Sequence, residues 1–293
     1  MDPKDAKLEG KVVVVTGSGR GIGRTLALAF AGMGARVGLT ARTAAEIEAV
    51  KAEVEAAGGT AAAVTCDVGD WEQVQAMASS LKDALGNCDV LVNNAGVSRF
   101  GSIAKMEPER FDAIMKTNAY GTFYCTRAFL PQMIEAGGGS VVNTSSVAAL
   151  QGYPAMSVYC MSKAAVNRFT ESASAEFQRF RVRVNAVMPT YIRTPLLMSG
   201  LREGDEEKFD IKEPDRLIPY FTFFASDALS KGVTGQCVDM EVFWQVEDLI
   251  AEATPEVRKW NAFREVLKAK LSPKAYEHAR TQRKLVQFLL KSL

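Results

Sequence analysis

Histidine is nearly absent from this chain, which has 293 residues and one histidine, His278, close to its C-terminal end. A mechanism that needs a histidine base together with other histidines is therefore excluded, and so is a metal site built from several of them. Proton transfer must then depend on tyrosine, lysine, aspartate, glutamate or cysteine. We expect His278 itself to lie on the polar face of a helix.

Paired cysteines, long apolar runs and net charge are also lacking. The five cysteines are scattered without a C-x-x-C pair, which favours reduced thiols over a disulfide framework or a zinc site. No apolar run reaches the ~18 residues of a membrane span, and the polar start MDPKDAKLEGK lacks the core of a signal peptide. The formal net charge of +1 gives no case for nucleic-acid binding. We therefore expect a cytoplasmic protein with no metal, no nucleic-acid partner and no transmembrane segment.

Short apolar runs rich in β-branched residues alternate with helical patterns along most of the chain. The strand patterns lie at 11–17, 35–42, 60–67, 88–96, 139–146, 181–189 and 236–242. Helical patterns separate them, at 21–34, 44–58, 71–86, 108–136 and 157–179. Near-continuous apolar strands that alternate with helices predict an α/β fold, with a doubly wound parallel sheet covered on both faces. Ligands of such sheets bind at the carboxyl ends of the strands.

Two segments interrupt this alternation. Residues 202–215 carry seven acidic and three basic residues, and we expect a mobile insertion there. Beyond about Gln245 the pattern predicts two or three amphipathic helices, and the part from Glu256 to Leu293 holds ten Lys/Arg against three Asp/Glu. The predicted division is a catalytic domain at 1–244 and a basic helical extension at 245–293.

The basic extension has three possible roles. Its apolar residues can pack on the core or on a second subunit, and these are Leu285, Val286, Phe288, Leu289 and Leu290. Alternatively, its basic residues can contact lipid headgroups at a membrane surface, and these are Arg280, Arg283, Lys284 and Lys291. We favour packing, because lysine and arginine commonly solvate the outer face of an amphipathic helix. The third possibility is a contact between this extension and the acidic 202–215 segment that gates the pocket.

Four glycines, Gly17, Gly19, Gly21 and Gly23, lie between the first strand and the first helix. Their spacing differs from G-x-G-x-x-G and from the G-x-x-x-x-G-K-S/T loop of phosphate-cleaving enzymes. The physics is the same, because positions without a side chain let backbone N–H groups approach a pyrophosphate at a helix N-terminus. The loop therefore predicts a dinucleotide site.

The end of the second strand indicates which dinucleotide binds. A free ribose 2′-hydroxyl usually meets an acid about 20 residues beyond the glycines. Here the strand ends at Arg42 and the first acid after it is Glu46. Arg42, together with Arg20 in the glycine loop, matches a 2′-phosphate. This pattern favours NADP(H) over NAD(H).

Five elements then occur in a characteristic order: TGSGRGIG at 16–23, Asp67-Val68, NNAG at 93–96, Asn118, and Ser146 followed by Tyr159 and Lys163. This set closely resembles the short-chain dehydrogenase/reductase family, and the resemblance covers about residues 10–242. It implies a Rossmann-like seven-stranded parallel sheet and hydride transfer between a nicotinamide and a carbonyl or secondary alcohol.

The resemblance also implies a role for each motif residue. Tyr159 is the general acid/base, and the neighbouring Lys163 ammonium is expected to lower the pKa of its phenol. Ser146 orients the substrate oxygen, and Asn118 holds a water in a proton relay. The implied cofactor contacts are Gly17, Ser18, Arg20, Gly21, Ile22, Gly23, Arg42, Asp67, Val68, Asn94, Ala95, Gly96, Tyr159, Lys163, Ile192 and Thr194.

The sequence departs from the family pattern at two places. Pro189-Thr190 stands where the family usually has Pro-Gly after the sixth strand. Asp239-Met240-Glu241 replaces the usual Asp-Gly-Gly at the end of the last strand, a terminus that packs in a tetramer interface in many relatives. The resemblance implies a homo-oligomer, and this departure leaves open whether it is a dimer or a tetramer.

The expected pocket walls are largely apolar, and they come from 97–100, 148–154, 188–191 and 196–198. We therefore favour a hydrophobic ketone as substrate and an NADPH-dependent carbonyl reductase as function. The alternative within the same class is a reductase of 3-oxoacyl thioesters. Arg99 could bind the anionic carrier of such a thioester. From another class, the chain could be a non-catalytic NADP(H) sensor or scaffold that acts through its C-terminal extension.

Overall fold

The computed structural model describes residues 6–201 and 204–292 and contains one seven-stranded sheet. The strand order is β3-β2-β1-β4-β5-β6-β7, and every neighbouring pair is parallel. The order reverses between β1 and β4, where a doubly wound sheet opens a crevice at the carboxyl ends of its strands. The predicted α/β fold is confirmed.

The strands coincide with the β-branched runs of the sequence, and the central ones are buried along their whole length. Burial on both faces explains why they read as continuous apolar runs rather than as alternating patterns. Their bounds are β1 (Val12–Thr16), β2 (Arg36–Ala41), β3 (Thr60–Thr65), β4 (Val90–Asn93), β5 (Gly139–Thr144), β6 (Val182–Met188) and β7 (Cys237–Asp239).

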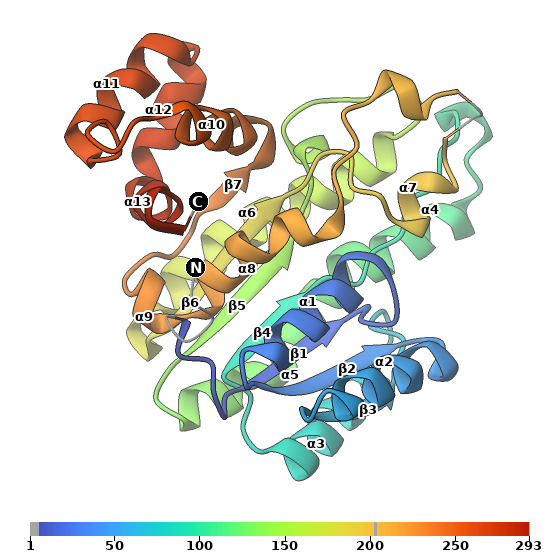
Figure 1. Ribbon diagram of the computed structural model, residues 1–293. Helices are drawn as coiled ribbons and strands as arrows, with labels where there is room; N and C mark the ends of the chain where they lie inside the picture. Colours follow the sequence, from blue (N-terminus) through green and yellow to red (C-terminus); the bar gives the residue numbers. More distant parts are fainter. Residues whose placement is uncertain (1–5, 202–203, 293) are drawn as a thin grey trace.

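Helices cover both faces of the sheet (Figure 1). One apolar cluster joins α1, α2 and α8 to one face, and a second joins α3, α5 and α6 to the other. The helices up to β7 are α1 (Gly21–Gly32), α2 (Ala44–Ala56), α3 (Trp71–Leu85), α4 (Pro108–Met115), α5 (Gly121–Glu135), α6 (Ser157–Phe177), α7 (Pro195–Met198), α8 (Ile218–Ala225) and α9 (Asp227–Ser230). A π-helical stretch, η3 (Lys116–Tyr120), joins α4 to α5. The single-turn 3₁₀ segments are η2 (Ile103–Lys105), η4 (Val147–Ala149), η5 (Gln178–Phe180), η6 (Glu206–Lys208) and η7 (Pro214–Leu217).

The last strand is shorter than its sequence pattern predicted. β7 ends at Asp239, and Met240 already begins a helix, so the strand prediction for 240–242 is wrong. The reason is local, because the Asp239 carboxylate accepts a hydrogen bond from the Glu241 N–H at 2.9 Å and caps that helix. The helices that follow are α10 (Met240–Glu252), α11 (Trp260–Lys270), α12 (Pro273–Thr281) and α13 (Arg283–Ser292).

We call α10–α13 the C-terminal extension; the division expected between 244 and 245 falls inside α10. The extension lies at the β7 end of the molecule, and α13 packs on α8 and α9 (Figure 1). The five apolar residues predicted to pack are all buried in the same cluster as α8. The side chains that a lipid-bound helix inserts are therefore already covered by this chain.

Three basic side chains of α12 and α13 have partners within the extension or directly after α9. Arg280 pairs with Glu277, Arg283 lies over the Trp260 ring, and the Lys284 ammonium donates to a backbone carbonyl at 231. His278, expected on a polar face, is half-buried and accepts a hydrogen bond from the Asp239 N–H at 3.1 Å. The single histidine is therefore a contact between α12 and the end of β7.

The acidic segment makes its ion pairs close by in the sequence. Arg193 pairs with Glu206 and Glu213, Lys208 with Asp205, and Lys212 with Asp210. Arg202 and Glu203 of that segment lie outside the described residues. Within 204–215, the recorded ion pairs connect the segment to itself and to Arg193. Lys212 also lies over the Trp244 ring of α10, 5.8 Å from its centre, so the segment contacts the first helix of the C-terminal extension. That this contact gates the pocket stays a prediction.

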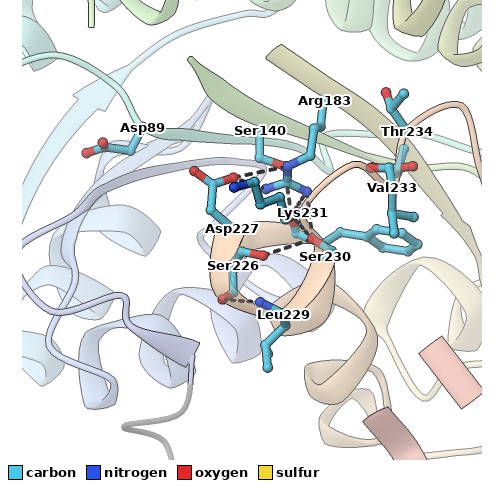
Figure 2. A network of polar contacts seen from close by, with 12 residues as sticks. Asp89, Ser140, Arg183, Ser226, Asp227, Leu229, Ser230, Lys231, Val233 and Thr234 are labelled. Atoms are coloured by element: carbon cyan, nitrogen blue, oxygen red, sulfur yellow. Dashed lines mark hydrogen bonds and ion pairs between the residues drawn. The ribbon is translucent and has the colours of Figure 1, made fainter. Parts of the chain in front are cut away.

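A buried arginine ties α9 to the amino ends of β5 and β6. Figure 2 shows Arg183, from β6, pointing toward α9, where it donates to the Asp227 carboxylate at 2.7 Å and to the Ser230 hydroxyl at 2.7 Å. It also donates to the Phe224 carbonyl, which accepts a second hydrogen bond from Ser140. Burial lowers the pKa of Arg183 and Asp227 opposes that effect. This network lies at the amino ends of the strands, on the opposite side of the sheet from their carboxyl ends.

Candidate functional site

A cavity of about 890 Å³ lies at the carboxyl ends of the strands. It is lined by nearly all of the residues that the sequence selected for catalysis and cofactor binding. These are Gly17, Arg20, Gly21, Ile22, Arg42, Asp67, Val68, Asn94, Ala95, Gly96, Ser146, Tyr159, Lys163, Ile192 and Thr194. Ser18, Gly23 and Asn118 are predicted site residues that do not line it, and each has a structural contact instead.

The glycine loop is shaped by close backbone contacts. Gly17 has a φ of +65°, and a Cβ there would lie 2.9 Å from the Ala95 Cα. A Cβ on Gly23 would lie 2.2 Å from the Gly17 carbonyl oxygen, so this glycine lets α1 approach the loop. The Ser18 hydroxyl accepts a hydrogen bond from the Thr40 N–H at 2.9 Å and holds the loop to β2.

Thr16 is a site-building residue that the sequence analysis did not select. Its hydroxyl accepts hydrogen bonds from the N–H groups of Asn94 at 2.9 Å and Ala95 at 3.0 Å. The Asn94 amide donates in return to the Thr16 carbonyl at 3.0 Å. These bonds fix the NNAG segment against the glycine loop. A threonine that ends a strand is too common a pattern to have been singled out.

Tyr159 and Lys163 lie one turn apart on α6, and both face the cavity. The Lys163 Nζ is 5.8 Å from the centre of the Tyr159 ring and donates to the Thr144 carbonyl at 2.8 Å. Burial raises the pKa of Tyr159 to about 12, whereas a hydrogen bond with the Ser146 side chain acts to lower it. The expected lowering of this pKa by Lys163 is therefore not found in the free protein, where desolvation has the largest effect on the phenol.

The Lys163 ammonium is buried in the wall of the cavity. Burial lowers its pKa to about 8. An ammonium group has three donors, and the recorded hydrogen bond to Thr144 occupies one of them. The remaining donors suit the hydroxyl groups of a ribose, so the residues at this place fit the nicotinamide nucleoside of a dinucleotide.

Ser146 lies at the end of β5, where it caps the short η4 segment. Its hydroxyl accepts a hydrogen bond from the Ala148 N–H at 3.2 Å and donates to the Pro189 carbonyl at 3.5 Å. Ser146 and Tyr159 both line the cavity and come from adjoining elements, since α6 packs on η4. A carbonyl oxygen can therefore meet two hydroxyl groups at this point.

Asn118 is buried inside the π-helical stretch η3. Its side-chain oxygen accepts from the Val97 N–H at 2.8 Å, and its amide donates to the Val97 carbonyl and to the Ser162 hydroxyl, each at 2.9 Å. Both amide hydrogens are used, so the side chain braces the loop after β4 against α6. Its expected role in holding a water stays a prediction.

At the end of the cavity next to the glycine loop, Arg20 and Arg42 lie near the N-terminus of α2 with Glu46. Arg20 forms an ion pair with Glu46 at 3.5 Å. At the start of α3, Asp67 accepts a hydrogen bond from the Gly69 N–H at 2.9 Å. The Cys66 thiol beside it has its pKa raised to about 12, mainly by burial, and is therefore a poor nucleophile.

The opposite end of the cavity is walled mainly by apolar and aromatic side chains. The Tyr191 ring stacks on Phe209 with ring centres 4.5 Å apart, and Tyr153 lies across from them. Phe100 closes against the backbone of Gly200, where a Cβ would lie 2.3 Å from its ring. Phe209 and Gly200 were not predicted, because Phe209 lies inside the polar acidic segment and Gly200 lies just before it, rather than at a strand end.

Thr190, which departs from the family pattern, has an ordinary backbone conformation. Thr190 lines the cavity and is not among the described non-glycine residues with positive φ, which are Lys7, Ala155 and Arg181. The threonine is thus accepted without backbone strain.

All five cysteines are unpaired, and within 6–201 and 204–292 no group of three or more metal-binding side chains is found. No helix of those residues is long and apolar enough to cross a membrane.

Comparison with known proteins agrees with this geometry. The family model for short chain dehydrogenase matches residues 11–204. The 3-oxoacyl-acyl-carrier-protein reductase of Thermotoga maritima is 34% identical over 241 residues, which cover 80% of this chain and 98% of that protein. The D-threitol dehydrogenase of Mycolicibacterium smegmatis is 35% identical over 76% of this chain and 89% of that protein. The structure of a gluconate 5-dehydrogenase from Burkholderia cenocepacia, in complex with NADP and tartrate, aligns with a TM-score of 0.77 and 29% identity over 81% of this chain and 96% of that one.

Proposed function

Since this chain belongs to the short-chain dehydrogenase family, we propose that it is an NADP(H)-dependent carbonyl reductase with Tyr159 as its general acid/base. The observation that carries the proposal is the shared cavity. Ser146, Tyr159 and Lys163 lie along one part of its wall, and the glycine loop and two arginines lie along another. A dinucleotide that spans such a cavity brings its nicotinamide to the hydroxyl groups.

A nicotinamide held by these residues would supply the hydride for the carbonyl carbon. Ser146 donates a hydrogen bond to the carbonyl oxygen and orients it. Tyr159 gives its phenolic proton to the same oxygen as the carbon accepts the hydride. With its pKa raised to about 12, the phenol holds this proton at neutral pH and is ready to act as an acid.

Lys163 acts on the phenolate that remains. A buried ammonium 5.8 Å from the phenol ring stabilises the negative charge that forms as the proton leaves. Its free donors would hold the ribose hydroxyls of the nicotinamide nucleoside. Asn118 is a positioning residue in this scheme, since its hydrogen bonds fix Val97 beside the cavity and Ser162 on α6.

The test is oxidation of NADPH with a panel of hydrophobic ketones, compared with a Tyr159→Phe variant. We expect kcat/KM to fall by about a hundred- to ten-thousandfold in the variant, with the NADPH dissociation constant unchanged within about threefold. Tyr124→Phe is the matched control, because Tyr124 packs on Trp71 away from the cavity. If NADPH binds but no carbonyl is turned over, a sensor or scaffold replaces this proposal.

The preference for NADP(H) rests on Arg20 and Arg42, and the NADP in the Burkholderia structure is consistent with it. Arg42→Ala should weaken NADPH binding by about tenfold, because a phosphate dianion loses a charge-assisted partner. NADH binding should change by less than about threefold in the same variant. Equal losses for both cofactors, measured by fluorescence titration, would remove the argument for a 2′-phosphate.

Reduction of 3-oxoacyl thioesters is the second candidate, and Arg99 favours it. Arg99 lines the cavity, and its recorded hydrogen bond goes to its own neighbour, the Ser98 carbonyl, at 3.4 Å. An anionic carrier could meet this guanidinium while the acyl chain meets the apolar walls. Arg99→Gln should raise KM for a 3-oxoacyl thioester by about five- to tenfold and leave KM for a neutral ketone unchanged. An unchanged thioester KM would count against this candidate.

We also propose that the protein is a cytoplasmic homo-oligomer. Phe111 of α4, Phe123 of α5 and Met161 of α6 are exposed, as is Tyr120 of η3. Phe123 also contacts Phe169 of α6, with ring centres 6.2 Å apart. Exposed apolar side chains grouped on neighbouring helices are typical of association surfaces. Light scattering should give the mass of a dimer or tetramer, and a monomer at micromolar concentration would contradict this.

A further inference from the structure

Glu46 occupies an unexpected place in the cofactor end of the cavity. It is the third residue of α2, and the preceding Thr43 makes T-x-x-E, the pattern of a helix capping box. No capping box forms in the structure, because the Thr43 side chain makes no hydrogen bond to the first turn of α2. The Glu46 carboxylate instead reaches the glycine loop. A Cβ on Gly19 would lie 2.8 Å from one of its oxygens, and the other is 3.5 Å from the Arg20 guanidinium.

The charged groups around Glu46 indicate which part of a ligand its carboxylate would meet. Arg20, Arg42 and Glu46 all line the cavity, and Arg20 pairs with Glu46. Arg20 is one of the two arginines that suit a 2′-phosphate, and it is the partner of Glu46 in the free protein. The ion pair is weak, since the side chains of Arg20 and Glu46 are 65% and 34% exposed, so a ligand can displace it at little cost. A carboxylate that stays beside the arginines then faces the phosphate.

We infer that Glu46 is a specificity-determining residue. Its negative charge weakens binding of the 2′-phosphate of NADP(H), and it therefore reduces the ratio by which this chain prefers NADP(H) to NAD(H). The inference rests on the proposed function only for the identity of the cofactor. Glu46 neutralises one of two arginine charges, so a dianionic phosphate meets a local charge of about +1 instead of +2. Coulomb repulsion between a carboxylate and a phosphate that shares its arginine partner, at a wet surface and screened by physiological salt, would correspond to about three- to tenfold in affinity.

The test measures binding of 2′,5′-ADP and of 5′-AMP by calorimetry, because these two probes differ at the 2′ position and carry no nicotinamide. Glu46→Gln should tighten 2′,5′-ADP about three- to tenfold and change 5′-AMP by less than twofold. The ratio of NADH to NADPH dissociation constants should rise by the same factor. The gain should shrink at 0.5 M salt, because the interaction removed is electrostatic.

Glu48→Gln is the matched control. Glu48 lies on the same helix, is exposed and does not line the cavity, so the substitution makes the same change in net charge at a distance. It should change neither probe by more than about 1.5-fold. An unchanged or weaker 2′,5′-ADP affinity in Glu46→Gln overturns the inference, as does an equal gain for 5′-AMP or an equal effect of Glu48→Gln. Since no turnover is measured, absence of carbonyl reduction would contradict the proposed function and leave this result standing.

Discussion

Lys163 carries a charge in a place where a charge is costly. The residue is 4% exposed, and burial lowers the pKa of its ammonium to about 8 from 10.5. Below pH 8 both the folded and the unfolded chain hold the proton, so the full penalty of burying the cation applies. Between pH 8 and 10.5 the unfolded chain binds the proton and the folded chain does not, so stability rises with pH across this window.

Lys163→Met should therefore stabilise the protein while it abolishes turnover. At pH 7 we expect the free energy of unfolding to increase by ~1–3 kcal/mol, the relief of desolvation less the hydrogen bond lost at the Thr144 carbonyl. The difference from the wild type should shrink as pH rises from 8 to 10.5. Urea unfolding at pH 7, 8.5 and 10 measures it. A variant that is less stable than the wild type at pH 7 would show that the ammonium is stabilised by its surroundings.

At the scale of single elements, the π-helical stretch η3 is held by one side chain. Asn118 satisfies both backbone groups of Val97 and the Ser162 hydroxyl in a buried place. Asn118→Ala leaves these groups without partners, and we expect a loss of ~2–4 kcal/mol in the free energy of unfolding. Lys116→Ala, two residues earlier on the exposed side of η3, is the control and should change stability by less than about 0.5 kcal/mol. Equal effects of the two variants would contradict the bracing role.

Elements with strong local patterns were predictable from the sequence. The run from Val12 to Val15 can bury its side chains on both faces only inside a parallel sheet, and the four glycines after it leave little choice but a tight loop. The end of β7 was not predictable, since Asp239 serves equally as a strand residue or as a helix cap. Its cap bond, which decides the matter, depends on the helix that α13 and α8 support from far along the chain.

The site divides in the same way between predictable and unpredictable features. Tyr159 and Lys163 share one helix, so helical geometry alone places them on one side. Glu46 and Arg20 come from different elements, and their ion pair depends on how α2 packs against the glycine loop. The pKa of Tyr159 was predicted with the wrong sign for a related reason. Spacing reveals a neighbouring charge, whereas burial depends on the whole fold.

At the scale of the molecule, the catalytic region and the C-terminal extension share a core. Glu247 of α10 is 6% exposed, accepts a hydrogen bond from Tyr220 of α8 at 2.6 Å, and pairs with Arg216. Glu247→Gln should lower the free energy of unfolding by ~2 kcal/mol, because it breaks a buried charge network. Asp248→Asn, on the exposed face of α10, should have no measurable effect.

Because the extension and α8 belong to one apolar cluster, both regions should unfold together. Calorimetry of the wild type and of Glu247→Gln should each show a single transition, shifted to lower temperature in the variant. Two separate transitions would support an independently folding unit at 245–293 and contradict the shared core.

His278 makes the stability of the contact between α12 and the end of β7 depend on pH. Burial lowers the pKa of its imidazole, Asp239 acts to raise it and Lys274 acts to lower it. A protonated ring cannot accept the hydrogen bond from the Asp239 N–H. The unfolded chain binds the proton more readily, so stability present above pH 6.5 is lost as pH falls through the lowered pKa. Relative to His278→Gln, the wild type should lose stability between pH 7 and 5 in urea unfolding, and parallel curves would contradict this.

The single imidazole at the contact between α12 and β7 also provides an NMR probe that is already present in the protein. Only one imidazole is present in the chain, so its Hε1 signal needs no assignment by mutagenesis. That signal sits where α12 meets the end of β7, and β7 adjoins β6, whose carboxyl end leads into the cavity wall at Pro189. Titrating cofactor or substrate against this one resonance therefore measures, without any label, whether filling the cavity is felt in the C-terminal extension.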